Sequence, residues 1–218
     1  MIRVSKTLLQ FSTRSLFTQP ALKMSGSGFK IYTKTGDKGQ SSTFTGERRS
    51  KDDEVFEALG SNDELSSHIG YSAELWKNAD LPNLERLYKI QCCLQDIGSN
   101  IATPKSSARE AHLKRTEFSE IHTKELEDWI DEMTTILPPL KNFILPSGGL
   151  CSSHLHITRT ICRRAERRCI PLMKAGEMDM EPVKFLNRLS DFLFTAARFA
   201  AFTQNYEEKV YIKPVTKK

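Results

Sequence analysis

Residues 159–168 read RTICRRAERR, and the rest of the chain can be arranged around this stretch. It contains no Gly or Pro, and apolar residues recur around it at helical spacing. Two series with seven-residue steps would lie on one side of such a helix: Leu155, Cys162 and Cys169, and Thr158, Ala165 and Leu172. We therefore predict a long helix that runs to about residue 175 and buries this stripe in a helical core.

The predicted helix has a strongly basic flank. At about 100° per residue, Arg159, Arg163 and Glu166 fall together beside the stripe, whereas Arg164 and Arg168 point more nearly away from the core. The planar guanidinium of arginine suits phosphate oxygens, so one interpretation is a polyphosphate clamp in which Glu166 orients the arginines or accepts from a ligand. The alternative is a solvated basic face with i,i+4 support, and spacing alone does not separate the two.

Four other segments have helical periodicity. They cover about 52–76, 81–101, 118–137 and 182–204. Residues 103–117 lack periodicity and are predicted to form a crossing loop. Together with the arginine-rich helix, these segments predict an all-α, single-domain five-helix bundle.

The first of these helices carries acids that matter for the basic flank. Asp52 is the predicted N-cap. Glu57, Asp63 and Glu64 are candidates for ion pairs with the arginines across the bundle, and the alternative for each is a solvated carboxylate.

The last predicted helix has a polar face beside its buried seam. Asn187, Asp191, Phe194 and Arg198 share that face, because offsets of about four, seven and eleven residues return to nearly the same angle. An amide, a carboxylate and an arginine in one row more often form a structural network than a binding site, and both interpretations stay open.

A glycine-rich segment lies near the start, within IYTKTGDKGQSSTFTGERR at 31–49. Gly36, Gly39 and Gly46 would let backbone N–H groups approach a phosphate, while lysines and hydroxyl groups add donors. The spacing fits neither GxxxxGKS/T nor GxGxxG. Taken by itself, the segment has a plain mobile loop as its default interpretation.

Four motifs together resemble the PduO-type ATP:cob(I)alamin adenosyltransferase family. They are the segment at 31–49, FILPSGG at 143–149, the arginine-rich helix and FLNRLSD at 185–191, in order over about residues 30–213. The resemblance implies transfer of the 5′-deoxyadenosyl group of ATP to Co(I) of cobalamin, with release of triphosphate. It also implies ATP and cobalamin as substrates, Mg²⁺ beside the phosphates, and a homotrimer with its sites between subunits.

The resemblance also implies roles for individual residues. The expected catalytic set is Arg159, Arg163, Glu166, Phe143 and Asp191. The expected ATP contacts are Thr33, Lys34, Thr35, Gly36, Ser41, Ser42, Lys51, Arg163, Arg164, Ala165, Glu166, Arg167 and Asn187. No protein ligand for a metal ion is predicted.

Three of these residues have specific implied positions. Phe143 would fill the lower axial side of the corrinoid, where an apolar side chain excludes water and favours four-coordinate Co(II); the sequence alone favours an ordinary core aromatic. Asp191 would line the cobalamin side of the site. Asp37 would pair with Arg159 across the subunit interface, and the alternative is that both act within one chain.

The implied reaction needs no protein nucleophile, because Co(I) is itself the nucleophile. The sequence offers no compelling triad, so the expected tasks of the protein are positioning and charge stabilisation. An alternative function is a cobalamin carrier that delivers adenosylcobalamin to an acceptor mutase. An ATP-dependent kinase is disfavoured, since Walker and kinase motifs are absent.

Residues 1–24 differ in composition from the remainder. They contain Arg3, Lys6, Arg14 and Lys23, many hydroxyl residues and no acid, which is typical of a mitochondrial transit peptide. The alternative is a disordered tail. These four charges make up most of the formal net charge of +5, so the basic balance does not indicate nucleic-acid binding.

Domain limits and location follow from these observations. We predict a transit peptide with a flexible joint over 1–28, the adenosyltransferase domain over 29–213 and a tail over 214–218. The five cysteines form no CxxC pair and suit a reducing compartment such as the mitochondrial matrix. His154 and His156 are two residues apart and would make a poor metal chelate. No apolar run approaches the ~20 residues that span a bilayer.

Overall fold

The structure is a computed structural model that describes residue 32 and residues 34–214. The chain divides into two units, Met1–Lys34 and Thr35–Lys218. The predicted transit peptide at 1–28, the predicted ATP contact Thr33 and most of the predicted tail at 214–218 lie outside the described residues. Within the described part, no helix has the length and hydrophobicity needed to cross a bilayer.

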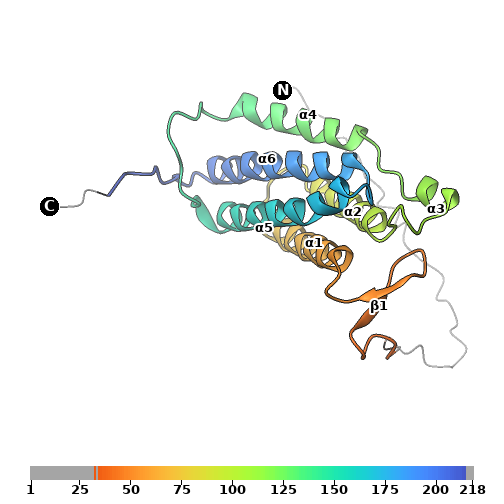
Figure 1. Ribbon diagram of the computed structural model, residues 1–218. Coiled ribbons are helices and arrows are strands. Elements are labelled where there is room, and N and C mark those ends of the chain that lie inside the picture. The colour runs from red at the N-terminus through yellow and green to blue at the C-terminus, as the bar shows by residue number, and fades with distance from the viewer. Residues whose placement is uncertain (1–31, 33, 215–218) are drawn as a thin grey trace, which may run out of the picture. The chain divides into compact units, whose positions relative to one another are not determined.

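The second unit is built almost entirely from helices, as predicted (Figure 1). The helices are α1 (Glu54–Asn78), α2 (Glu85–Ile101), α3 (Glu110–Arg115), α4 (Ile121–Ile136), α5 (Gly149–Lys174) and α6 (Met180–Thr203). The strands are β1 (Gln40–Ser42) and β2 (Arg48–Ser50). The five predicted helices all occur, whereas α3 lies in the stretch predicted to be a loop. It is six residues long and buries none of them, so it has no periodicity that the sequence could reveal.

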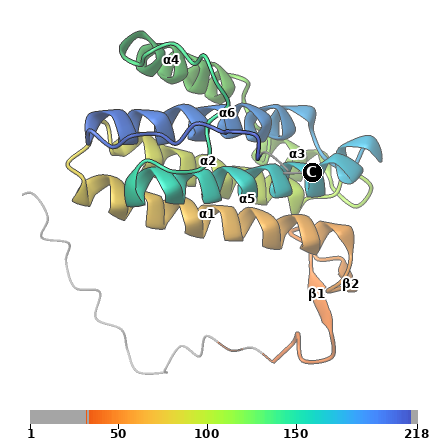
Figure 2. The same cartoon turned by 90° about the vertical axis from the view of Figure 1, so that its left-hand side faces the viewer.

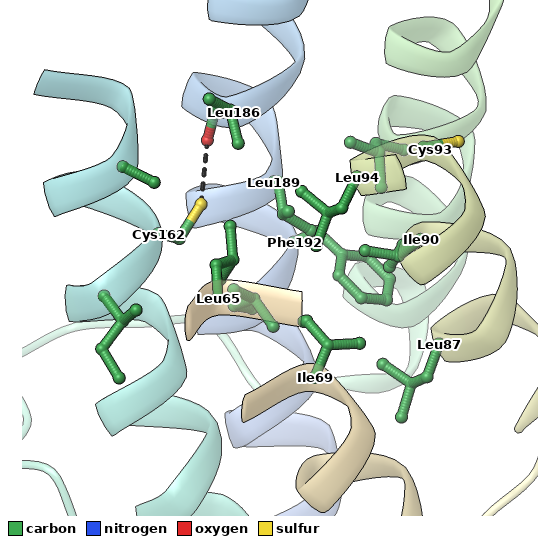
Figure 3. Packing of buried hydrophobic residues seen from close by; sticks show 14 of the residues in the cluster. Leu65, Ile69, Leu87, Ile90, Cys93, Leu94, Cys162, Leu186, Leu189 and Phe192 are labelled. Atoms are coloured by element: carbon green, nitrogen blue, oxygen red, sulfur yellow. Dashed lines mark hydrogen bonds between the residues drawn. The ribbon is translucent and has the colours of Figure 1, made fainter. Parts of the chain in front are cut away.

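The core lies between α1, α2, α5 and α6, with α4 packed along α6 (Figures 1 and 2). Figure 3 shows Leu65 and Ile69 of α1 directed toward Ile90 and Leu94 of α2, which supply much of this core. The thiol of Cys162 donates a hydrogen bond to the carbonyl of Leu186 at 3.2 Å, joining α5 to α6.

The apolar stripe predicted on α5 is confirmed. All six of its members are buried: Leu155, Thr158, Cys162, Ala165, Cys169 and Leu172. Because this stripe faces the core, the basic flank beside it is placed at the edge of the α5–α6 contact.

The start of α1 lies one residue later than predicted. The N-cap is Asp53, whose side chain accepts from the backbone N–H of Val55 at 2.9 Å; Asp52 precedes it. The sequence DDE allows either register, and burial of Val55 selects the one that turns Val55 into the core.

The glycine-rich segment forms an antiparallel hairpin of β1 and β2, in which Ser41 faces Arg49. Its tip is attached to the bundle, because the N–H of Phe44 donates to the carbonyl of Ala102 at 2.7 Å. Thr45 and Ser107 share a further hydrogen bond of 2.9 Å between their hydroxyl groups. The segment is therefore supported within its own chain, which the alternative of a plain loop did not anticipate.

Candidate functional site

The cluster at the edge of α5 and α6 contains Glu166 and Asn187. The amide Nδ2 of Asn187 donates to Oε1 of Glu166 at 2.8 Å. These residues are 21 positions apart in sequence and come from two separately predicted motifs. The fold thus brings together two of the predicted ATP contacts and orients the one carboxylate of the arginine-rich stretch.

The five arginines of α5 divide into groups. Arg164 pairs with Glu64, and Arg168 lies 3.6 Å from Glu57, so both face α1. Two of the three predicted cross-bundle pairs are therefore present. Asp63 has no ion pair among the described residues and instead lines a groove between α1 and α2. Arg164 is accordingly neutralised on the α1 side of the helix, away from the Glu166–Asn187 pair.

Arg163 and Arg167 remain as available cations. Both are exposed, and neither is within 4.0 Å of a carboxylate oxygen in the part of the chain that the structure describes. Two exposed guanidinium groups beside an oriented carboxylate form an arrangement that suits a polyphosphate. The Cβ of Ala165 points into the core, so this predicted contact would act only through its backbone.

Arg159 differs from the other arginines of α5 in having a guanidinium nitrogen that is buried. It is half-buried, and its Nε atom is enclosed without a hydrogen-bond partner among the described residues. Burial and the neighbouring charge of Arg163 lower the pKa of Arg159. An enclosed guanidinium N–H is costly to leave unpaired, so the described residues do not fully satisfy Arg159 in this position.

His156 lies beside this arginine in the core. Burial, and then the charge of Arg159, lowers its pKa to about 4, so the ring is neutral at pH 7. Its ring packs 5.9 Å from that of Phe194 on α6, while His154 stacks on His68 of α1 at 5.3 Å. The two histidines thus point to different neighbours, as the two-residue spacing predicted.

The polar face predicted on α6 has two parts with different surroundings. Asp191 is exposed and accepts from Nη1 of Arg188 at 2.6 Å, while Nε of Arg188 donates to Glu127 of α4 at 3.1 Å. Arg198 is buried, where it donates to Glu208 and, at 2.9 Å, to the carbonyl of Pro138. Asn187 and Asp191 are therefore available to a ligand, whereas Arg198 belongs to a structural network.

Phe143 is not a core aromatic. Its side chain is 86% exposed, which contradicts the alternative that the sequence alone favoured. Its backbone is nevertheless held, since its carbonyl accepts from the N–H of Tyr211 at 2.8 Å beside the bridge between Ile144 and Val210. Residues 210–211 thus pair with this segment, and Ile212, next along the chain, is also exposed.

The two glycines of the PSGG motif are required by close packing at the start of α5. Gly148 and Gly149 have φ values of 97° and 87°, in the left-handed region. A Cβ on Gly148 would lie 2.5 Å from that of Ala201, and one on Gly149 would lie 2.5 Å from the ring of Tyr206. The motif therefore places the loop that carries Phe143 against the end of α6.

The hairpin gathers several of its predicted phosphate contacts. A Cβ on Gly36 would lie 3.1 Å from Nζ of Lys51, so the glycine makes room for this ammonium group. Arg48 was not among the predicted site residues, yet its guanidinium donates to the carbonyl of Thr35 at 2.9 Å and to the hydroxyl of Ser42 at 3.3 Å. The two adjacent arginines at the end of the motif, Arg48 and Arg49, were the feature of the sequence that could have indicated this role.

The remaining predicted contacts near the hairpin have less structural support. Lys34 belongs to the first unit, where its ammonium lies 5.8 Å from the ring centroid of Tyr32. Within residues 36–51, all of them described, no hydrogen bond or ion pair reaches Arg163, Glu166 or Asn187. Asp37 likewise has no ion pair with Arg159 in the described chain. Hydrogen bonds and ion pairs thus leave the described residues 36–51 unconnected to Arg163, Glu166 and Asn187 within one chain.

Sequence comparison identifies the family. A family model described as cobalamin adenosyltransferase matches residues 31–200. The corrinoid adenosyltransferase MMAB of Mus musculus is 63% identical over 184 residues, which is 84% of this chain and 78% of the mouse protein. The corrinoid adenosyltransferase of Bacillus subtilis is 44% identical over 78% of this chain and 85% of its own length.

Solved structures agree with this result. A variant of the PduO-type ATP:corrinoid adenosyltransferase from Lactobacillus reuteri, complexed with cobalamin and ATP, superposes with a TM-score of 0.77. It is 37% identical in sequence, and the match covers 84% of this chain and all of that one. The matched region contains the hairpin, the Phe143 loop, α5 and α6 up to residue 200, so the chain belongs to the cobalamin adenosyltransferase family.

Proposed function

We propose that this protein transfers the 5′-deoxyadenosyl group of ATP to the Co(I) centre of cobalamin, giving adenosylcobalamin and triphosphate. The observation that carries the proposal is the Glu166–Asn187 hydrogen bond, together with Arg163 and Arg167, which have no ion pair among the described residues. The Lactobacillus reuteri relative, which binds cobalamin and ATP, supports the choice of substrates.

The reaction is a displacement at C5′ of ATP. The Co(I) electron pair forms the cobalt–carbon bond, the C5′–O bond breaks, and its electron pair leaves with triphosphate. No thiol of the core competes as a nucleophile, because burial raises the pKa of Cys169 to about 12 and raises that of Cys162 as well. The work left to the protein is to position the substrates and to stabilise the charge on the leaving group.

Charge stabilisation is assigned to the basic flank of α5. Arg163 and Arg167 would bind the triphosphate as negative charge develops on it. Asn187 holds Glu166 through Oε1, which leaves Oε2 without a protein partner among the described residues. Carboxylate and phosphate oxygens are the ligands that Mg²⁺ prefers, so Glu166 fits a Mg²⁺ ion carried in by ATP.

The hairpin would supply the second set of ATP contacts. The cation of this set is Lys51, which lies beside Gly36. The donors are the hydroxyl groups of Ser41 and Ser42 and the backbone around Thr35. Lys34 and Thr33 are proposed to extend this set. Arg48 acts through its neighbours, because it holds Ser42 and Thr35 together.

Phe143 is proposed to face the corrinoid. A fully formed loop that presents an exposed aromatic side chain needs a reason, since burial would otherwise stabilise it by about 1.5–3 kcal/mol. Placed against the lower axial side of the corrinoid, this ring would be covered by the ligand and would exclude water from cobalt. Asp191, exposed on α6, is proposed to line the same side of the site.

A homotrimer with shared sites would join the two halves of the ATP site. One observation supports this arrangement: no polar contact links the described hairpin residues 36–51 to Glu166. We propose that Asp37 from a neighbouring subunit pairs with the guanidinium of Arg159, which is only half-buried. Deleting one member of a partly buried pair costs about 3–5 kcal/mol when burial is deep.

The proposed location is the mitochondrial matrix, on the basic, acid-free composition of residues 1–28. An adenosylcobalamin-dependent mutase is the proposed recipient of the product. A chain beginning at about Ser25 should retain full activity and fail to enter mitochondria. Its recovery from the matrix would contradict the targeting role.

Stoichiometric triphosphate release tests the function. Purified protein, MgATP and chemically reduced cobalamin should yield one triphosphate per adenosylcobalamin formed, whereas a carrier would release none and a kinase would release ADP. Mixing Asp37→Asn chains with Arg159→Ala chains tests the shared site. Mixed trimers should regain activity at interfaces that combine an intact hairpin with an intact α5, and no recovery despite proven subunit exchange would place both residues in one chain's site.

A further inference from the structure

A cavity of about 220 Å³ lies between α4 and the rest of the bundle, away from the residues assigned above. Its walls are mostly aromatic and aliphatic: Trp76, Leu87, Met133, Ile136, Phe192 and Phe199. Trp76 and Phe199 stack with their ring centroids 5.9 Å apart, and the indole N–H of Trp76 is occupied by the carbonyl of Pro82. The interior is therefore apolar, and its aromatic groups are held in place.

One edge of the cavity is charged, because Arg86 and Glu132 both line it. The guanidinium of Arg86 lies 5.4 Å from the ring centroid of Trp129. Nη2 of Arg86 donates to Glu132 at 2.5 Å, and in the described part of the chain this is the only protein hydrogen bond of the guanidinium. Nε and Nη1 are thus left as donors, on a side chain that is only 16% exposed.

The backbone at the same edge also favours a negative charge. Pro82 and Asn83 line the cavity immediately before α2, and the N-cap of α2, Leu84, makes no side-chain cap hydrogen bond. The first N–H groups of a helix carry partial positive charge and attract anions. Glu132 is half-exposed, so it can turn to solvent when another carboxylate takes its place.

We propose that this cavity binds a small monocarboxylate with an aromatic or branched apolar body. A dry cavity of about 150 Å³ accepts benzene, so this slightly larger one accommodates a ring with a short side chain. Once Glu132 has turned to solvent, the carboxylate would take Nη2 of Arg86 together with Nε or Nη1, and either donor pair suits a bidentate contact. A polyphosphate would find only one arginine in an otherwise apolar site.

The tryptophans supply a direct measurement. The chain has two, Trp76 in the cavity wall and Trp129 against Arg86, so the intrinsic emission comes from this region. Titrating the full chain with phenylacetate should change the emission saturably, with a Kd below about 1 mM. Phenylacetamide, which lacks the charge, and acetate, which lacks the ring, should each bind at least about tenfold more weakly.

Matched variants separate the proposed site from general effects. Arg86→Gln should weaken phenylacetate binding about tenfold, whereas Lys89→Gln should not, although Lys89 makes the neighbouring α2–α4 ion pair with Glu125. Ile136→Phe should fill the mouth of the cavity and abolish binding. Ile121→Phe adds the same bulk at the other, equally exposed end of α4 and should leave binding unchanged.

Several results would overturn the proposal. They are no saturable change of emission or melting temperature with phenylacetate up to about 5 mM, equal affinity for the acid and its amide, and full binding by Arg86→Gln or Ile136→Phe. Circular dichroism of each variant verifies that the bundle is intact. Neither ATP nor cobalamin enters the experiment, so its outcome is independent of the adenosyltransferase assignment.

Discussion

Replacing the amide of Asn187 by a carboxylate tests the cluster on α5 and α6 most directly. Asn187→Asp changes no volume, but it sets a second carboxylate where the amide Nδ2 now lies 2.8 Å from Oε1 of Glu166. Two unit charges about 3 Å apart repel by roughly 1.4 kcal/mol in water and by several kcal/mol in a less polar site. The lost hydrogen bond adds about 1 kcal/mol.

The exposed position of Asn187 moderates the repulsion, because water reaches the side chain and the two groups can move apart. We therefore expect a loss of about 1.5–3 kcal/mol in transition-state stabilisation, which corresponds to a ~10- to 150-fold fall in kcat/KM for ATP. The assay is adenosylcobalamin formation at limiting MgATP. Asn78→Asp adds the same charge at the exposed end of α1 and should leave kcat/KM within about twofold.

A repair variant makes the prediction specific. Combining Asn187→Asp with Glu166→Gln exchanges the carboxylate and the amide, so a hydrogen bond can form in the opposite direction. Part of the lost activity should return, and the two changes should therefore be non-additive. Full activity of Asn187→Asp at limiting ATP, with an unchanged melting temperature, would refute the assignment of this pair to the ATP site.

Three further predictions follow from other parts of the structure. Phe143→Ala should leave ATP binding unchanged and lower the fraction of four-coordinate Co(II) in bound cobalamin; an unchanged spectrum would contradict its proposed position. Gly149→Ala should lower the free energy of unfolding by several kcal/mol in urea titrations, because residue 149 has a left-handed backbone and its Cβ would collide with the ring of Tyr206. Wild-type stability of this variant would show that Tyr206 moves aside at little cost. Burial lowers the pKa of His156 to about 4 in the folded chain, below the ordinary 6.5, so the neutral ring contributes stability above pH 6.5 that is lost as the pH falls toward 4. His156→Gln should remove about 3 kcal/mol of that acid sensitivity, and identical pH profiles would exclude the histidine as its source.

Periodicity was sufficient to predict the helices, because burial of an apolar stripe imposes a repeat that survives in the sequence. The six buried residues of α5 illustrate this, as does the position of Glu57 and Glu64 opposite Arg168 and Arg164. Short elements without a buried face leave no such repeat. For this reason α3 and the β1–β2 hairpin were not predicted. The cap of α1 was placed one residue early because the sequence DDE allows either register.

The motifs of the family also predicted which residues would gather at the site, but their partners depended on the fold. Spacing could not show that Arg164 is neutralised by Glu64, that Arg198 is buried with Glu208, or that Arg48 connects Thr35 with Ser42. Each of these contacts joins segments whose separation depends on how the helices and the hairpin pack. Side-chain pairing is therefore a property of the tertiary structure, even where the residue types are suggestive.

The sequence by itself determined the helical class, the stripe of α5 and the grouping of its charged flank with FLNRLSD, because these depend on local periodicity and on motifs read along one chain. Only the tertiary structure decided that Phe143 is exposed and that Nε of Arg159 is enclosed without an acceptor in the described chain. An aromatic residue in a loop has no periodic partner to reveal its environment. Exposure is a relation between segments distant in sequence, so it is settled only when the chain has packed.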